Sequence, residues 1–427
     1  MSDMKAALDA ARIRLVNGGN TAPTLNPTPD SSSRDNTPIT TAHSAGLPIV
    51  DISPFLDPES SRERRTETAS AINAACINYG FFYLTGHGIP LSTLDKIIDL
   101  ARQFFALAPS EKHKIKRFDA GHPSGGDGAR GYQGLGENVT GGLQDMQEAI
   151  DLYAPWPADK REKGDGGDAS VKTLQGENLW PANPPELRSA YEAYIADVKK
   201  VGAAVVHAMG VALGLGPPAA ANPAPDDQDE QLFVRACEDS FWVLRMIAYP
   251  PLPSSHLDPP TTITSPSSSS SSSSSSNNNN NNNEDTTTTA QFSCGAHTDY
   301  GCITLLLTDP TPQALHIRLK DGTWLPASPL RGLFTVNIGD MMERWTNGIW
   351  KSTLHRVVHR GDGNGHGEAR ISVPFFFEPG FDAVVRPLDK CVARSGGKRV
   401  VEGEGTYGEH LLTKVFNNFY FSKRTEW

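Results

Sequence analysis

Residues 295–301 read Gly-Ala-His-Thr-Asp-Tyr-Gly, and a β-rich run that contains Thr304-Leu305-Leu306 follows closely. His297 and Asp299 are two residues apart, so at the end of an extended strand their side chains point the same way. Ferrous iron in oxygenases is commonly held by two histidines and one carboxylate on one face, which leaves other positions open. This stretch therefore predicts an iron site, completed by a histidine from elsewhere in the chain.

Two other stretches offer a histidine and a carboxylate with the same spacing. His256-Leu257-Asp258 is bounded by prolines, and His366-Gly367-Glu368 lies in a glycine-rich turn. Neither pair adjoins a predicted strand that would orient it. We therefore favour His297 and Asp299.

The second histidine cannot be chosen from spacing alone. His355 and His359 both lie in a predicted strand and are four residues apart. On a strand their Cα atoms would be about 13 Å apart, so only one of them can share a metal with His297. Both remain candidates at this point.

Helices precede strands in the predicted order of elements. The pattern predicts helices over about 61–78 and 91–107, and a long one from Pro184 in which apolar residues repeat at threes and fours. Short β-rich runs separated by turn residues follow at 241–249, 302–308, 315–319, 333–338, 353–359 and 371–377. This pattern is typical of a closed or double-sheet β core, so the expected fold class is α+β. Residues 118–183, rich in Gly, Asp and Pro, predict long surface loops.

Two segments lack core-forming residues. Residues 1–46 are rich in Ser, Thr, Asn and Pro, and the stretch 253–289 contains unbroken runs of serine and asparagine. Such compositions cannot bury enough apolar surface to offset the entropy of ordering, so we expect a disordered tail and a disordered insertion. The remainder divides into a helical and mixed region, 47–240, and a β domain, 241–427, that contains the insertion.

Bulk composition excludes several function classes. The net charge of −10 argues against a nucleic-acid-binding surface, which needs clustered Lys and Arg. No run approaches the ~18 apolar residues that cross a bilayer, and charges interrupt the N-terminal stretch where a secretory signal would lie. Five scattered cysteines indicate reduced thiols. We expect a cytoplasmic monomer that binds neither nucleic acid nor membranes.

A set of short motifs is spread over both halves of the chain. They are Pro48–Asp51, Gly80–Tyr83, Gly86–Gly88, Arg130–Tyr132, Asn178–Pro181, Gly295–Gly301, Val336–Asp340, Arg344–Gly348, Ser352–Val358 and Arg370–Ser372. Together they resemble the iron(II)- and 2-oxoglutarate-dependent oxygenases of the isopenicillin N synthase-like superfamily, over about residues 47–420 without the insertion. The resemblance implies a distorted double-stranded β-helix, or jelly roll, flanked by N-terminal helices.

The resemblance also assigns the metal ligands. It selects His355 as the third ligand beside His297 and Asp299. We then expect His359 to face solvent at a strand end.

For the co-substrate, Arg370 and Ser372 match the Arg-x-Ser pair that binds the far carboxylate of 2-oxoglutarate. The planar fork of arginine suits a carboxylate. Tyr249 matches a tyrosine that reaches the same carboxylate, although Ile247 stands where many members carry asparagine. Phe376 falls where an aromatic residue often faces the substrate.

The implied reaction consumes oxygen and 2-oxoglutarate at iron(II), releases succinate and carbon dioxide, and hydroxylates, desaturates or cyclises a small organic substrate. Ascorbate would serve as the reductant in vitro, and no catalytic side chain beyond the metal centre is implied. Two alternatives stay open. One is an oxidase of the same superfamily that does without 2-oxoglutarate, and the other is a catalytically silent binding protein on this scaffold.

Overall fold

The computed structural model describes residues 46–118, 129–140, 143–156, 174, 176–216, 229–252, 292–361, 367–401 and 404–415. All of them belong to one unit, Thr40–Trp427. The predicted disordered insertion and nearly all of the predicted tail lie outside the described residues, as do His256, Asp258 and His366.

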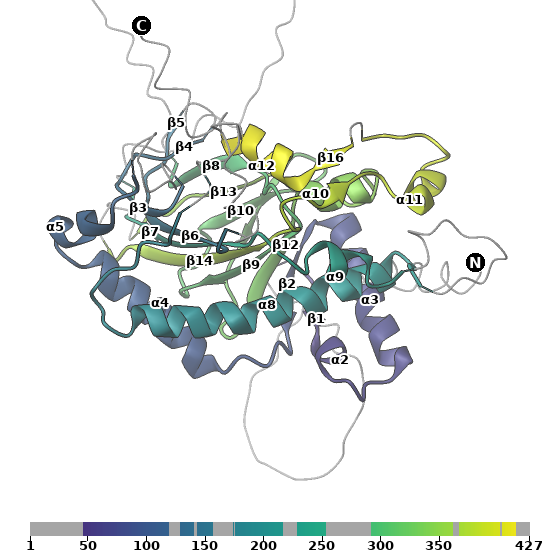
Figure 1. The fold of residues 1–427 in the computed structure, drawn as a ribbon, viewed down its shortest axis with the longest axis horizontal. Helices are drawn as coiled ribbons and strands as arrows, with labels where there is room; N and C mark the ends of the chain where they lie inside the picture. Colours follow the sequence, from purple (N-terminus) through teal and green to yellow (C-terminus); the bar gives the residue numbers. More distant parts are fainter. Residues whose placement is uncertain are drawn as a thin grey trace, which may run out of the picture. The chain divides into compact units, whose positions relative to one another are not determined.

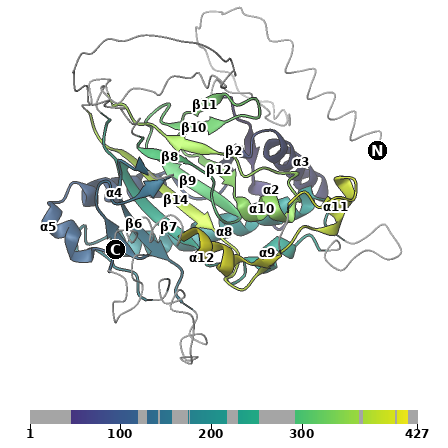
Figure 2. The same ribbon diagram turned by 90° about the horizontal axis from the view of Figure 1, so that it is seen from above.

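Two β-sheets form the centre of this unit (Figures 1 and 2). The large sheet contains, in spatial order, β1 (Ile49–Asp51), β2 (Phe81–Thr85), β12 (Phe334–Ile338), β9 (Ile303–Thr308), β14 (Arg370–Phe377), β7 (Val243–Tyr249), β6 (Glu148–Tyr153) and β3 (Gly131–Gln133). The small sheet contains β11 (Trp324–Ala327), β10 (Leu315–Arg318), β13 (His355–Val357) and β8 (Cys294–His297). Every described strand pair in them is antiparallel except β1 with β2.

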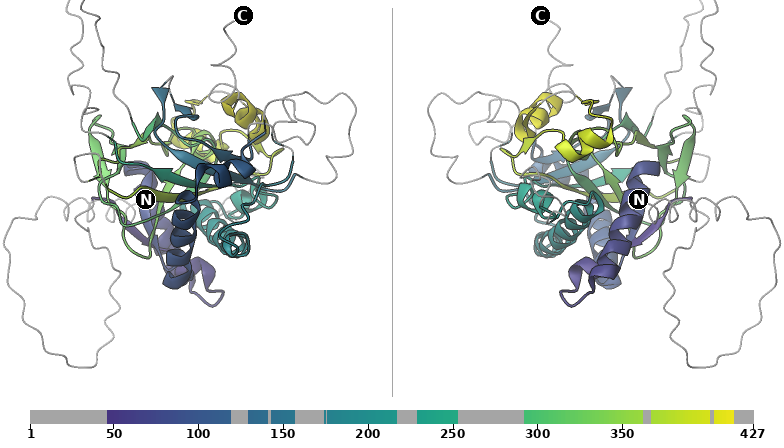
Figure 3. Two further views of the ribbon diagram at one scale, coloured as in Figure 1. Left: turned by 90° about the vertical axis from the view of Figure 1, so that its left-hand side faces the viewer. Right: turned by 90° about the vertical axis from the view of Figure 1, so that its right-hand side faces the viewer.

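Three long helices lie on one side of the large sheet (Figure 3). They are α3 (Arg62–Asn78), α4 (Leu91–Phe105) and α8 (Leu187–Ala212). Helix α8 contacts β9 and β14, and α4 contacts β7 and β14. The predicted apolar stripe of α8 is buried, as Tyr191, Val198 and Val205 illustrate, so this prediction is confirmed.

The shorter elements complete the description. The helices are α2 (Ser53–Leu56), α5 (Pro109–Lys112), η1 (His113–Ile115), α9 (Leu232–Ala236), α10 (Asp340–Trp345), α11 (Asp389–Arg394) and α12 (Tyr407–Val415). The remaining strands are β4 (Val139–Thr140), β5 (Leu143–Gln144), β15 (Val384–Val385) and β16 (Gly405–Thr406).

Strand alternation separates two apolar cores. Along β7, Leu244 and Met246 join the core beneath the helices, whereas Ile247 and Tyr249 join the core between the two sheets. The second core also contains residues of the small sheet, so the inner faces of the two sheets pack against each other. Inward-facing side chains of β7, β14 and β8 therefore meet in one space.

The prediction of surface loops over 118–183 is wrong where strands form, most clearly at two strands of the large sheet. Gly131–Gln133 and Glu148–Tyr153 are the strands β3 and β6, which extend the large sheet beyond β7. Residues Ala149 to Leu152 are buried. Their Gly- and Asp-rich surroundings hid the strands, because strand partners far away in sequence stabilise them.

Two further findings bear on the composition. Of the helices in the described residues, none has the length and apolar character to span a membrane. All five cysteines are buried and free of disulfides.

Candidate metal centre

Two neighbouring strands of the small sheet bring the predicted ligands together. His297 is the last residue of β8, and His355, the first residue of β13, is its cross-strand partner. Asp299 Oδ1 lies 3.8 Å from His297 Nε2 and 3.6 Å from His355 Nε2. The possible ligand atoms of the three residues lie within 4.8 Å of one another. In the described part of the chain, no other group of His, Cys, Asp and Glu meets this criterion for a metal site.

The backbone fixes the orientation of both imidazoles. Nδ1 of His297 lies 2.8 Å from the carbonyl oxygen of Gly295, and Nδ1 of His355 lies 3.0 Å from that of Thr353. A carbonyl only accepts, so each Nδ1 must carry the proton and donate it. Each Nε2 then faces the space beside Asp299, where a metal ligand would have to lie.

The carboxylate of Asp299 is oriented in the same way. Its Oδ2 accepts hydrogen bonds from Thr304 Oγ1 at 2.5 Å and Asn337 Nδ2 at 2.6 Å, which leaves Oδ1 facing the imidazoles. Thr304 and Asn337 come from the adjacent strands β9 and β12 of the large sheet. The sequence did not identify Thr304 and Asn337 as site residues. Nothing in the sequence around them indicates that their side chains would bond to Asp299.

The turn after Asp299 is held by Glu378 and by the start of α10. Glu378 accepts a hydrogen bond from the Cys302 backbone N–H at 3.1 Å, and a Cβ built on Gly301 would overlap the Glu378 carboxylate. A larger residue at position 301 would therefore have to displace that carboxylate. Asp340 N–H donates to the Asp299 carbonyl at 2.8 Å, which ties the turn to the start of α10.

The protonation states of His355 and Asp299 suit metal binding, whereas His297 must release a proton when it binds a metal. Burial alone would lower the pKa of His297, but Cys294 and Asp299 outweigh burial and raise that pKa to about 10. Burial and the adjacent His297 lower the pKa of His355 to about 4, so the imidazole of His355 is neutral at neutral pH. Burial alone would raise the pKa of Asp299. The two imidazoles and the hydrogen bonds from Thr304 and Asn337 outweigh burial and lower that pKa, so the carboxylate is ionised.

The residues predicted to bind the co-substrate lie on β7 and β14. Arg370 is opposite Tyr249 in register, with its guanidinium carbon 5.3 Å from the centre of the tyrosine ring. Ser372 follows two residues later on the same face, and Arg370 and Ser372 are each 2% exposed. Among the described residues, Nε and Nη1 of Arg370 and Oγ of Ser372 have no hydrogen-bond partner.

Such groups are costly when buried. An unsatisfied polar group costs about 1–3 kcal/mol, and a charged one more. A cation and a hydroxyl left open side by side fit an anionic ligand, and the bidentate fork of Arg370 fits a carboxylate. The donor set at His297, Asp299 and His355 likewise fits iron(II).

All seven predicted site residues line one cavity of about 70 Å³: His297, Asp299, His355, Arg370, Ser372, Tyr249 and Phe376. Gln147, Arg245 and Cys294 also line it, and none of these three was predicted. The cavity lies between the two sheets, so the predicted metal ligands and the residues predicted to bind the co-substrate share one space.

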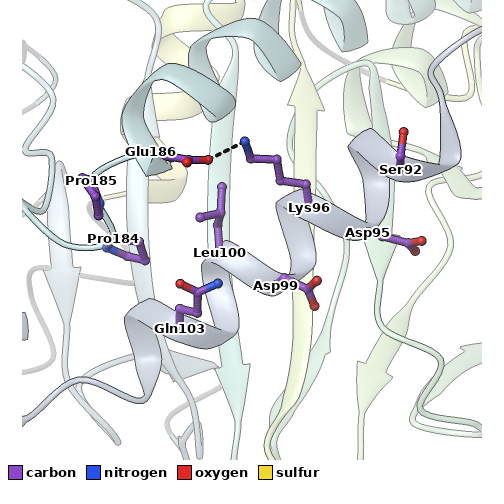
Figure 4. A pocket seen from close by; sticks show the side chains of 9 residues that line it. All are labelled: Ser92, Asp95, Lys96, Asp99, Leu100, Gln103, Pro184, Pro185 and Glu186. Carbon is purple, nitrogen blue, oxygen red and sulfur yellow. Dashed lines mark ion pairs between the residues drawn. The ribbon is translucent and has the colours of Figure 1, made fainter.

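A larger hollow, of about 500 Å³, lies on the helical side of the unit between α4 and the residues that precede α8 (Figure 4). Two of its charged groups, Lys96 and Glu186, form an ion pair at 2.5 Å. It is open to solvent and contains no histidine or cysteine. It is therefore a poor candidate for the predicted chemistry.

The expectation that His359 faces solvent is wrong. The residue is 6% exposed; its Nε2 lies 3.0 Å from the Glu368 carbonyl, and its backbone N–H donates to Ser293. It lies beyond the end of β13 and does not line the cavity. His359 is thus a buried structural residue. The expectation failed because its partners lie on other segments, which the sequence does not place next to it.

Comparison with known proteins identifies the family. The model described as "non-haem dioxygenase in morphine synthesis N-terminal" matches residues 47–183, and that of the 2OG-Fe(II) oxygenase superfamily matches residues 243–379. Homoarginine-6-hydroxylase 2-ODD-C23 of Glycine max is 37% identical over 380 residues, which cover 88% of this chain and 98% of the relative. The chain belongs to the 2OG-Fe(II) oxygenase superfamily.

Two further relatives agree. The 2-oxoglutarate-dependent dioxygenase tropC of Talaromyces stipitatus is 29% identical over 374 residues, covering 86% of this chain and 94% of the relative. A Neurospora crassa protein crystallised with alpha-KG and 5-formyluracil has a TM-score of 0.62 at 22% identity, covering 88% of this chain and 98% of that one. The similarity to this crystal structure supports the fold.

These findings confirm the expected family, the jelly-roll core flanked by helices and the reaction class. The protein is a 2-oxoglutarate-dependent dioxygenase, an oxidoreductase that uses iron(II) and 2-oxoglutarate. The oxidase without 2-oxoglutarate and the silent binding protein lose their support, because the curated relatives named above are hydroxylases or 2-oxoglutarate-dependent enzymes.

The hydrogen bond from Thr304 to Asp299 gives a prediction. Thr304→Val keeps the shape of the side chain but removes the donor, so Asp299 should be less well oriented and the affinity for iron(II) should fall about 10- to 100-fold. Metal titration against a competing chelator measures this. Thr335→Val is the control, because Thr335 is also a buried threonine but lies on β12 instead of β9. This variant should bind iron as the wild type does. Equal affinity in both variants would contradict the role given to Thr304.

Proposed function

We propose that Nε2 of His297, Oδ1 of Asp299 and Nε2 of His355 hold the catalytic iron(II). The observation that carries this proposal is the convergence of three oriented ligand atoms, each with its other polar atom already bonded to the protein. An accidental cluster has no need for such orientation. The neutral state of His355 and the ionised state of Asp299 support the same assignment.

Arg370, Ser372 and Tyr249 bind the far carboxylate of 2-oxoglutarate in this proposal. Arg370 supplies the charge and the fork, Ser372 a hydroxyl donor, and Tyr249 a ring packed against the guanidinium. Burial lowers the pKa of Arg370, since desolvation disfavours its charged form, and a bound carboxylate would favour that form again. The Ile247 side chain, opposite Ser372, offers no polar contact to the co-substrate.

The protein and its bound groups divide the work. When bound, iron and 2-oxoglutarate supply the oxidising chemistry that inserts oxygen into a substrate C–H bond, with succinate and carbon dioxide as co-products. The protein orients these groups and excludes bulk water. Apolar side chains of the cavity, among them Leu306, Val357 and Phe376, line the space beside the proposed metal ligands. Phe376 is one candidate to face the substrate.

For the substrate, we propose homoarginine or a closely related basic amino acid, hydroxylated on its side chain. Four curated relatives at 34–37% identity over 87–88% of this chain bear the name homoarginine-6-hydroxylase. Each alignment covers at least 89% of the relative. The likeness therefore extends over the whole catalytic unit and supports a shared substrate class.

Turnover tests the substrate proposal. Purified enzyme with iron(II), 2-oxoglutarate, ascorbate and L-homoarginine should form a product heavier by one oxygen atom, with one succinate per product, measured by mass spectrometry. Asp299→Ala removes a ligand and should reduce both products to background. Homoarginine that stays unchanged while another substrate is hydroxylated would reject the substrate but keep the reaction class.

Arg370→Leu tests the co-substrate site. Loss of the charge-assisted hydrogen bonds should raise the Kd for 2-oxoglutarate about 100-fold, whereas iron(II) affinity should stay within about twofold. Titration of the anaerobic iron enzyme with 2-oxoglutarate, followed by its visible absorbance, gives the Kd. Arg331→Leu, at an arginine whose side chain is 72% exposed, is the control and should change neither value. An unchanged Kd in Arg370→Leu would refute the assignment.

A further inference from the structure

The cavity contains a buried amide outside the metal centre. Gln147, which immediately precedes β6, is 2% exposed and lines the cavity together with Arg370 and Ser372. Neither the amide nitrogen nor the amide oxygen of Gln147 has a hydrogen-bond partner among the described residues. A buried polar group without a partner is costly, so an amide left open beside a cavity indicates that a ligand bonds to it.

The strand register shows which cavity residues are the neighbours of Gln147. Glu148 is opposite Ala248 on β7. Continued by one residue, the same register brings Gln147 opposite Tyr249, and Tyr249 is opposite Arg370 on β14. Because neighbouring strands lie about 4.8 Å apart, the Cα atoms of Gln147 and Arg370 are about 10 Å apart in this row. Their long side chains can therefore bond to one small group that lies between them.

The second arginine of the cavity lies outside this row. Arg245 is four residues from Tyr249, hence about 13 Å along β7. It is opposite Asp151, and its Nε donates to Asp151 Oδ1 at 2.5 Å. Of the two arginines that line the cavity, only Arg370 shares the row of Gln147. The group between Gln147 and Arg370 is therefore expected to be the anion that Arg370 binds.

The far carboxylate of 2-oxoglutarate offers more acceptor positions than Arg370 and Ser372 fill. Its two oxygens have about four lone-pair sites. The fork of Arg370 fills two of them and the hydroxyl of Ser372 fills one. The row of Ser372 supplies no other donor on β7 or β6, because Ile247 and Ala149 occupy it there. A neutral amide in the row of Arg370 fills the fourth site and adds no second charge to the buried space.

We propose that the amide nitrogen of Gln147 donates a hydrogen bond to the far carboxylate of 2-oxoglutarate. The amide oxygen then accepts from the hydroxyl of Tyr249, which lies between Gln147 and Arg370 in the row. Gln147 thereby favours a co-substrate that carries a carboxylate at this end. The inference rests on the proposed co-substrate site at Arg370, and it deepens that site by naming a further residue that determines its specificity.

Gln147→Met tests this role, because methionine is similar in size and lacks both polar atoms. Titration of the anaerobic iron(II) enzyme with 2-oxoglutarate should give a Kd about 10- to 100-fold above that of the wild type, since a hydrogen bond to a charged group is lost. Iron(II) affinity should stay within about twofold of the wild type. The melting temperature of the ligand-free protein should not fall, because the amide has no partner among the described residues.

A second ligand separates recognition of the carboxylate from a general disturbance of the cavity. 2-Oxopentanoate has the chain length of 2-oxoglutarate, but a methyl group replaces the far carboxylate. Gln147→Met should bind 2-oxopentanoate within about twofold as tightly as the wild type does. A purely structural role for Gln147 would instead weaken the binding of both ligands and lower the melting temperature.

Two further variants complete the experiment. Gln147→Glu places a negative charge beside the carboxylate, so it should weaken 2-oxoglutarate binding more than Gln147→Met does. Gln144→Met is the matched control, because Gln144 is an exposed glutamine three residues away. This control should leave the Kd of both ligands unchanged.

The outcomes separate this inference from the proposed co-substrate site. If Arg370→Leu raises the Kd for 2-oxoglutarate and Gln147→Met does not, the role of Gln147 is overturned and the site at Arg370 stands. Equal losses of 2-oxoglutarate and 2-oxopentanoate binding in Gln147→Met also overturn it. If neither variant changes the Kd for 2-oxoglutarate, both proposals fail.

Discussion

The site depends on one cross-strand pair, His297 opposite His355 in the small sheet. The pairing of β8 with β13 puts two imidazoles side by side, with ring centres 4.3 Å apart, although they lie 58 positions apart in sequence. Asp299 follows the end of β8 and turns its carboxylate toward both. If the register slipped by one residue, the side chain of one histidine would point to the opposite face of the sheet. Every further feature of the site is arranged around this pair.

The inner face of the large sheet carries an unusual concentration of buried polar groups with open valences. Arg370, Ser372, Arg245 and Gln147 all have polar atoms that lack partners among the described residues. A chain selected for stability alone would have replaced them with apolar side chains. Their positions in one cavity support the proposal that ligands complete their hydrogen bonds, with the carboxylate of 2-oxoglutarate at Arg370.

Local sequence patterns were sufficient for much of this structure. The apolar repeat of α8 and the β-rich runs that became β7, β9 and β12 are local patterns, so they could be predicted without knowledge of their partners. His297 and Asp299 could be predicted as candidate ligands because both lie within three residues. The family resemblance supplied His355, which spacing alone could not separate from His359. The register explains the choice, since only His355 is opposite His297.

The features missed by the sequence analysis depend on contacts between distant segments. The strands β3 and β6 form because β7 offers an open edge, and His359 is buried by groups on separate segments. Arg245 has no distinctive sequence context within its strand. Its guanidinium is held by Asp151, which lies 94 positions earlier in the chain. Orientation by remote partners has no signature in a single sequence, and it is what distinguishes a site residue from a chance histidine or arginine.

The location of the metal tests the central claim most directly. Crystals grown anaerobically with iron(II) and 2-oxoglutarate, measured above and below the iron absorption edge, would reveal the metal by anomalous scattering. We predict one peak, bound by His297 Nε2, Asp299 Oδ1 and His355 Nε2, with the co-substrate reaching to Arg370. A peak on another group, such as His359, or bound iron that does not contact these three atoms would contradict the account.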